Sequence, residues 1–183
     1  MWRDLVAEQP VPPPESVWDY PRPPDVVPSA ELVEVHHAGR CIASTSRSLR
    51  VRETSHPPTY YLPAQAFSPG VLRAVPGTTF CEFKGVAHYF DLVVIESGDG
   101  RTVGPAERAA GSERVAARAA WHYPRTTPGF EALRGHVAVM SGAVDACYVD
   151  GERVQPQDGS FYGGWITSRV AGPFKGAPGT RGW

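Results

Sequence analysis

Lysine is nearly absent from this sequence of 183 residues, although basic residues are not. Sixteen of the 18 basic residues are arginine, and the two lysines, Lys84 and Lys175, each stand in a Phe-Lys-Gly tripeptide. Together with much alanine and glycine, this preference is typical of a GC-rich genome. A lysine that persists against it is a candidate functional residue.

The sequence also lacks a long apolar run and any clustering of charge. No run approaches the ~20 residues that a membrane-spanning helix needs, and the segment MWRDLVAEQP lacks the basic-then-apolar pattern of a signal peptide. The formal net charge is −1 and the arginines are scattered, which argues against a nucleic-acid-binding protein. We therefore predict a cytoplasmic protein whose partner is neither a membrane nor nucleic acid; the oligomeric state stays open.

Cysteine pairs and metal-binding spacings are missing as well. The three cysteines, Cys41, Cys81 and Cys147, form no C-x-x-C pair, which argues against a disulfide framework and a zinc knuckle. Cys81 is expected to be a small buried thiol rather than a nucleophile, because no histidine is fixed near it in sequence. The histidines show no H-x-H or H-x-x-x-H spacing, so neither a metal nor another cofactor is predicted, although separate segments can still assemble a site in space. They are His36, His37, His56, His88, His122 and His136.

Composition divides the chain into three parts, of which only the middle one resembles a folded domain. Residues 1–30 hold eight prolines interleaved with Trp18 and Tyr20, which predicts an extended arm that lies on the domain. Residues 31–150 form the predicted domain, since a chain of this length favours a single core. Residues 151–183 are rich in glycine and aromatic residues and predict an irregular wrap.

Short alternating runs separated by turn residues fill the middle part and are typical of β-strands. Residues 31–37 and 40–46 are predicted to form a hairpin, and further strands are expected at 48–54, 59–63, 136–142 and 144–150. Residues 78–97 are predicted to form a continuous strand with a bulge or bend at Gly85, because one glycine is too short for an ordinary hairpin turn.

Other segments are expected to form turns and loops. Short helical turns are expected within 63–72 and 128–135, a hairpin turn at 97–100 and a polar loop at 107–114. Many short strands with almost no helix predict an all-β fold, namely a compact single-domain β-barrel or sandwich with one or two short helical turns.

Three ordered segments carry a family resemblance: VRETSHPPTYYLP, TFCEFKGVAHYFDL and AAWHYPRTTPGFEALRGHVAV. They resemble the DUF427 domain family over residues 31–148, with a strand ending in Glu, a Y-Y-x-P step, a C-x-aromatic-K-G-x-A-x-Y core and an A-W-x-Y step before Pro128. Phe83 stands where Trp or Tyr is common, and the glycine-rich end belongs to a subgroup. The resemblance implies a mostly β domain, related to β-tent folds that bind small molecules in an aromatic pocket.

The family is also filed under a nucleotidyltransferase-like label, which the residues do not favour. Such enzymes usually hold Mg²⁺ with a D-x-D pair, and this chain contains neither that pair nor a G-x-x-x-x-G-K-[ST] phosphate loop. A nucleotidyltransferase-like enzyme therefore stays an alternative rather than the leading hypothesis.

The candidate catalytic residues are Glu53, His56 and Lys84. Glu53 shares a strand face with Leu49 and Val51, so we expect it to point inward and to pair with Lys84, in preference to a Glu82–Lys84 pair. Such a pair has a structural reading, and a functional one in which Lys84 binds a carboxylate or phosphate or acts as a base. His56 lies in a polar turn stiffened by two prolines, which suits a binding site.

Several aromatic residues complete the candidate site. They either pack the core or wall a pocket for a flat or cationic ligand, with Glu53 supplying charge. Trp165 and Trp183 would cap that pocket or plug a barrel end. The leading hypothesis is a small-molecule-binding domain, with residues that also fit acid–base or lyase-type catalysis. A non-catalytic structural or interaction module is the third hypothesis. The candidate ligand-binding residues are Tyr60, Tyr61, Tyr89, Trp121 and Tyr123.

Overall fold

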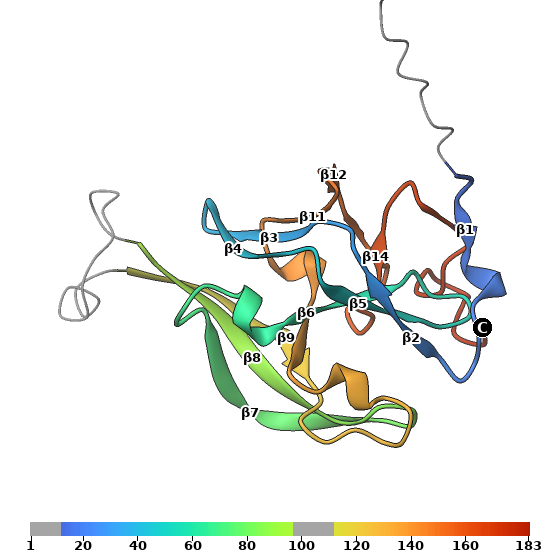
Figure 1. Ribbon diagram of the computed structural model, residues 1–183, viewed down its shortest axis with the longest axis horizontal. Coiled ribbons are helices and arrows are strands. Elements are labelled where there is room, and N and C mark those ends of the chain that lie inside the picture. The colour runs from blue at the N-terminus through green and yellow to red at the C-terminus, as the bar shows by residue number, and fades with distance from the viewer. Residues whose placement is uncertain (1–11, 97–111) are drawn as a thin grey trace, which may run out of the picture.

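Two β-sheets dominate the computed structural model, which describes residues 12–96 and 112–183 (Figure 1). The turn expected at 97–100 and most of the loop expected at 107–114 lie outside the described residues, as does the start of the arm. The larger sheet has seven strands in the order β2 (Asp25–Ser29), β5 (Ser48–Arg52), β6 (Thr59–Pro63), β10 (His136–Val139), β9 (Ser112–His122), β8 (Gly85–Glu96) and β7 (Leu72–Cys81). The smaller sheet has four strands in the order β12 (Glu152–Arg153), β11 (Ala146–Val149), β3 (Val33–His37) and β4 (Arg40–Thr45).

The remaining elements are short. Two-residue strands pair β1 (Glu15–Ser16) with β15 (Val170–Ala171) and β13 (Gln155–Pro156) with β14 (Trp165–Ile166). Helical structure in the described residues is limited to 3-10 turns, η1 (Val17–Asp19), η2 (Ala64–Ala66), η4 (Glu131–Leu133) and η5 (Ser141–Ala143). The all-β prediction is confirmed, and η2 and η4 lie within the two segments where helical turns were expected. No helix in this part of the chain is long and apolar enough to cross a membrane.

The main core lies between the two sheets. Alternation along β3 turns Val33 and Val35 inward, where they meet Leu62 of β6 and Val137 of β10, all four of them at most 1% exposed. Trp165 is fully buried in this core and donates its indole N–H to the Val139 carbonyl oxygen, 3.0 Å away. This face of the larger sheet is therefore closed by packing.

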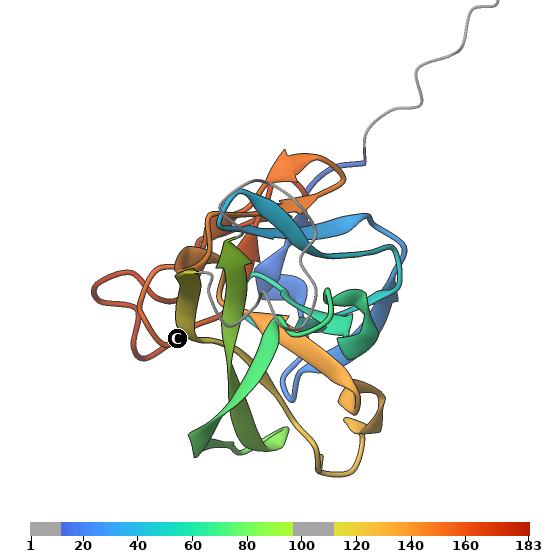
Figure 2. The same ribbon diagram turned by 90° about the vertical axis from the view of Figure 1, so that its left-hand side faces the viewer.

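The opposite face of the larger sheet carries a second apolar cluster. Tyr61 and Ala138 point to this side because their strand neighbours point into the main core, and Tyr123, Phe130 and Leu133 join them. The sheet curls around this side, where the long strands β7 and β8 extend away from the smaller sheet (Figure 2). An apolar concave surface is thus left for other parts of the chain to cover.

Strands β7 and β8 form a hairpin, so the prediction of one continuous strand bent at Gly85 is wrong. Cys81 pairs with Gly85, and residues 82–84 make the turn. None of these three residues is a typical turn former, which is why the sequence pattern concealed the turn. Gly85 has φ +104°, a conformation that side chains rarely adopt, and a Cβ there would lie 3.1 Å from the Arg125 carbonyl oxygen.

The arm and the C-terminal segment (residues 151–183) lie side by side. β1 pairs with β15, and Trp18 packs edge-on against Trp183 with their ring centroids 5.3 Å apart. Residues 25–29, which the composition placed in the arm, instead form the edge strand β2 of the larger sheet. The C-terminal segment is mostly irregular and reaches the concave side of that sheet.

Candidate functional site

A cavity of about 650 Å³ lies on the concave side of the larger sheet. Its walls come from β5, β6 and the segment between them, the β7–β8 hairpin, the end of β9, Met140 and the C-terminal segment. Pockets of ~300–1,000 Å³ are the usual size for small-molecule sites. The cavity therefore has room for a small ligand.

Aromatic side chains make up much of the wall. Of the predicted residues, Tyr61, Tyr89, Trp121 and Tyr123 line the cavity. The Trp121 indole N–H donates to the Tyr61 hydroxyl oxygen at 3.2 Å, which fixes the orientation of both rings. Burial raises the pKa of Tyr61 and of Tyr123, so both phenols are neutral at physiological pH. Four further rings that the sequence reasoning missed also line the cavity: Phe80, Phe83, Phe161 and Tyr162.

Tyr60 does not line the cavity. As the strand neighbour of Tyr61 it points to the opposite face of the sheet, where its ring packs 5.1 Å from that of Trp165. Its hydroxyl donates to the Glu31 carboxylate at 2.7 Å, so the hydroxyl already has a hydrogen-bond partner on that side of the sheet. The structure therefore places Tyr60 in the fold rather than in the site.

The predicted ion pair between Glu53 and Lys84 is absent from the described residues, and so is the alternative pair with Glu82. Glu53 instead lies 3.4 Å from the guanidinium of Arg22, in the arm. The Lys84 ammonium lies 5.9 Å from the ring centroid of Tyr123, at cation–π range. The prediction failed because Lys84 lies in the hairpin turn and not on a strand face opposite Glu53. Both side chains nevertheless line the cavity.

Two more cations reach the cavity. The Arg118 guanidinium lies 4.1 Å from the ring centroid of Tyr89 and donates to the Pro76 carbonyl oxygen at 2.7 Å. Lys175 folds back onto the same cavity; its ammonium lies 6.0 Å from the Tyr162 ring centroid and donates to the backbone oxygen of Trp183 at 2.7 Å. No Asp or Glu side chain of the described residues forms an ion pair with Lys84, Arg118 or Lys175.

His56 lies at the cavity in a defined tautomer. Its Nδ1 is 3.0 Å from the Thr54 carbonyl oxygen, which can only accept, so Nδ1 carries the hydrogen and Nε2 is the acceptor of the neutral ring. Burial lowers the pKa of His56, and the nearby Glu53 carboxylate only partly opposes that shift. His56 is therefore a neutral imidazole at pH 7, with Nε2 free of hydrogen bonds to the described residues.

The C-terminal segment closes one side of the cavity through residues that lack side chains. A Cβ on Gly163 would overlap the indole ring of Trp121, and one on Gly164 would overlap Gln157 and Pro57. This close approach brings Phe161 and Tyr162 to the cavity. Trp165 and Trp183, the two aromatic residues proposed as a cap, lie in the main core and against Trp18 instead.

Sequence reasoning missed Arg118 for a local reason. The pairing of β8 with β9 shifts register between Phe90 and Leu92, and Arg118 lies opposite that irregularity with φ +49°. Such a bulge redirects a side chain from the face that strict alternation assigns to it. Cys81 also lines the cavity, partly buried beside the second apolar cluster.

Potential metal ligands within the described residues gather outside this cavity. Glu34, His36 and Cys41 bring one donor atom each to within 4.8 Å of one another, on the smaller sheet. None of them lines the cavity.

Comparison with known protein families gives a match to the middle of the chain. Residues 25–150 match the family described as "Domain of unknown function (DUF427)". The chain belongs to the DUF427 family. A search of curated proteins found no match. The DUF427 region spans β2 to β11 and supplies Glu53, His56, Lys84 and Trp121, whereas Phe161, Tyr162 and Lys175 come from beyond it.

Proposed function

We propose that the cavity binds a small molecule that combines a flat ring with negative charge. The observation that carries the proposal is the set of three cations, Lys84, Arg118 and Lys175, each next to an aromatic ring and none paired with an Asp or Glu side chain of the described residues. Aromatic walls offer stacking area to a flat ring, and the cations offer charge-assisted hydrogen bonds to a carboxylate or phosphate.

The balance of charge at the cavity supports an anionic ligand. Two carboxylates, Glu53 and Glu82, accompany the three cations, and Arg22 already compensates Glu53 from outside the lining. Tyr61 and Tyr123 are buried at the cavity wall, and a cation beside buried rings attracts an anion more strongly than it would at the open surface. With Glu53 compensated, Glu82 is the remaining carboxylate among the lining residues, and the cations outnumber it.

His56 adds acid–base chemistry to the proposed binding. A neutral imidazole with a free Nε2 is a general base at neutral pH, and the nearby Glu53 stabilises the imidazolium that forms once a proton is taken. Lys84 and Arg118 would hold the anionic group of the ligand while His56 moves a proton to or from it. This arrangement fits a lyase-type or other proton-transfer reaction better than phosphoryl transfer.

Thermal-shift measurements on the full chain would test the proposal with three ligand sets. Aromatic carboxylates and nucleotides should raise the melting temperature in proportion to the logarithm of their concentration, and aromatic amines of the same size should not. Each nucleotide is measured with and without Mg²⁺. A response to nucleotides that depends on Mg²⁺ would favour the nucleotidyltransferase-like alternative. No response to any ring-bearing anion would leave a structural or interaction module as the better account.

A further inference from the structure

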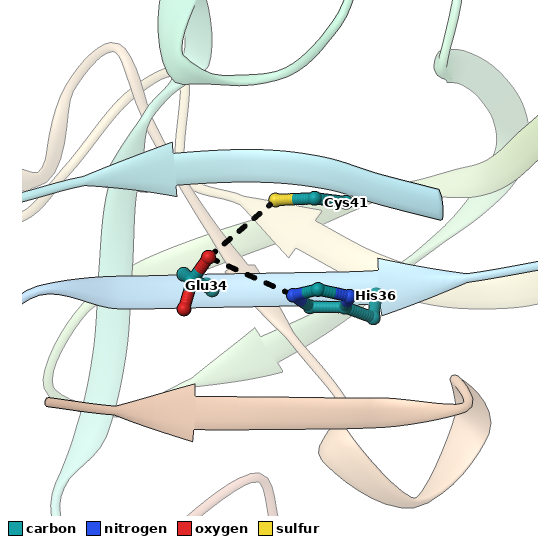
Figure 3. Close-up of side chains that lie close together, drawn as sticks. All are labelled: Glu34, His36 and Cys41. Carbon is teal, nitrogen blue, oxygen red and sulfur yellow. Dashed lines mark hydrogen bonds and ion pairs between the residues drawn. The ribbon is translucent and has the colours of Figure 1, made fainter. Parts of the chain in front are cut away.

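Three side chains of different donor type meet on the smaller sheet (Figure 3), and none of them lines the aromatic cavity. The Glu34 carboxylate oxygen lies 3.7 Å from Nε2 of His36 and 4.0 Å from Sγ of Cys41. All three are at least partly accessible to solvent, and Cys41 is exposed. A carboxylate, an imidazole and a thiol therefore share one small region of the surface.

The β3–β4 hairpin brings the three residues together. Glu34 and His36 are two apart on β3, so they share the face opposite Val33 and Val35, which are buried in the main core. Cys41 on β4 is the pairing partner of His36, next to a register shift between Val35 and His36. Because the backbone of a hairpin with one buried face is well fixed, the three donors are largely pre-positioned.

We propose that Glu34, His36 and Cys41 bind a divalent transition-metal ion of the zinc class. In a tetrahedral site with metal–ligand distances of ~2.0–2.3 Å, neighbouring donor atoms lie roughly 3.3–3.8 Å apart. The Glu34–His36 and Glu34–Cys41 separations of 3.7 and 4.0 Å approach that range, and all three donor atoms lie within 4.8 Å of one another, so side-chain rotations would close the site.

The donor set selects the class of metal. A thiolate and an imidazole suit zinc and its neighbours among the transition metals, whereas Mg²⁺ and Ca²⁺ prefer oxygen ligands only. One thiolate and one carboxylate would balance the two positive charges of the ion. Without an ion, the Cys41 thiol is a weak donor that lies 3.4 Å from the Ala43 carbonyl oxygen and 4.0 Å from the Glu34 carboxylate oxygen.

The surroundings favour an accessible site with an incomplete protein ligand set. The His36 ring packs edge-on against Tyr148 with the centroids 5.2 Å apart, which restrains the imidazole. The described residues supply three ligands, so water would fill the fourth position, as in other three-ligand zinc sites. Bound metal would clamp β3 to β4 and stabilise the folded state in proportion to its occupancy.

Cobalt titration of the tag-free full chain, after treatment with a chelator and under reducing conditions, tests this site. Co²⁺ reports its ligands by absorption, so we expect one equivalent to give tetrahedral bands and a sulfur-to-cobalt charge-transfer band, and Zn²⁺ to displace it. Cys41→Ser should abolish the charge-transfer band, and His36→Asn and Glu34→Gln should each weaken binding by about tenfold or more. Zn²⁺ should raise the melting temperature of the unaltered chain and not that of Cys41→Ser.

Two matched controls use the same residue types elsewhere in the described chain. Cys81→Ser and His136→Asn should leave both the spectrum and the affinity unchanged. Circular dichroism establishes that each variant is folded, which is expected for Cys41→Ser because the side chain is exposed. The proposal is overturned if no charge-transfer band forms, or if the band persists in Cys41→Ser.

Discussion

Gly163 lies directly against the indole ring of Trp121, so closely that a single added methyl group would overlap the ring. The contact joins a residue outside the matched family region to an aromatic residue inside it. Trp121 cannot easily move aside, because its indole N–H is held by the Tyr61 hydroxyl. The cavity is therefore shaped jointly by the DUF427 region and the C-terminal segment.

Replacing Gly163 with valine should push the C-terminal segment off the cavity wall. We expect a loss of about 1–3 kcal/mol in unfolding free energy from overpacking, with a larger loss of ligand affinity, because Phe161 and Tyr162 would shift with the segment. Denaturant unfolding and ligand titration measure the two effects. Gly182→Ala is the matched control, since no atom lies within 4 Å of its position. Unchanged affinity in Gly163→Val would show that the segment does not contribute to binding.

Lys84→Met should separate a binding role from a structural one. Because the Lys84 ammonium forms no ion pair with the described residues, its removal should change the unfolding free energy by no more than about 0.5 kcal/mol. Losing a charge-assisted hydrogen bond worth about 1.5–3 kcal/mol should weaken binding of a ring-bearing anion by roughly tenfold to a hundredfold. Denaturant titration and calorimetry check the two outcomes. Arg134→Met, at an exposed position outside the cavity lining, is the control. A loss of several kcal/mol in unfolding free energy would instead support a structural role for Lys84.

The two neighbouring tyrosines of β6 should respond in opposite ways to loss of the hydroxyl group. Tyr60→Phe removes a buried hydrogen bond to Glu31, so we expect about 1–2 kcal/mol less stability and unchanged ligand binding. Tyr61→Phe leaves the indole N–H of Trp121 without its acceptor at the cavity, so ligand affinity should fall. Comparing unfolding curves and binding isotherms of the two variants checks this. Weakened binding in Tyr60→Phe alone would contradict the assignment of these residues to opposite faces.

Alternation of side chains was enough to predict much of the fold. The β3–β4 hairpin follows from its Ala-Gly turn signal, and β5 follows from a run in which apolar and polar residues alternate, because one buried face imposes that period. The same pattern could not reveal the turn at residues 82–84, since a Glu-Phe-Lys turn carries no glycine, proline or asparagine signal. Gly85 has a positive φ and directly follows that turn. In the sequence, this glycine suggested a bend within one continuous strand instead of a hairpin.

Side-chain partners were harder to predict than strand faces. Tyr61, Tyr89, Trp121 and Tyr123 were expected at a pocket and line one, but adjacent Tyr60 was assigned to it against the alternation of its own strand. Partners that are distant in sequence, such as Arg22 for Glu53, depend on how the arm crosses the domain, which no local pattern encodes. The Glu34, His36 and Cys41 group does carry a signal: two residues on one strand face, and a third opposite them across a predicted hairpin.

His56 should make the stability of the domain depend on pH. Burial lowers its pKa below the unfolded value of about 6.5, although Glu53 opposes the shift while Lys175 and Arg22 add to it. The unfolded chain therefore binds a proton first as the pH falls. The contribution of His56 to the unfolding free energy is therefore complete above about pH 6.5, and it declines as the pH falls from there toward the lower pKa of the folded state.

Substitution of His56 tests this pH dependence. Melting temperatures between pH 8 and pH 5 should decline less steeply in His56→Gln than in the unaltered chain. Burial also lowers the pKa of His122, so His122 contributes a further part of the pH dependence. The melting temperature of the double variant His56→Gln/His122→Gln should therefore decline least as the pH falls. An identical slope in His56→Gln and the unaltered chain would contradict a buried neutral imidazole at the cavity.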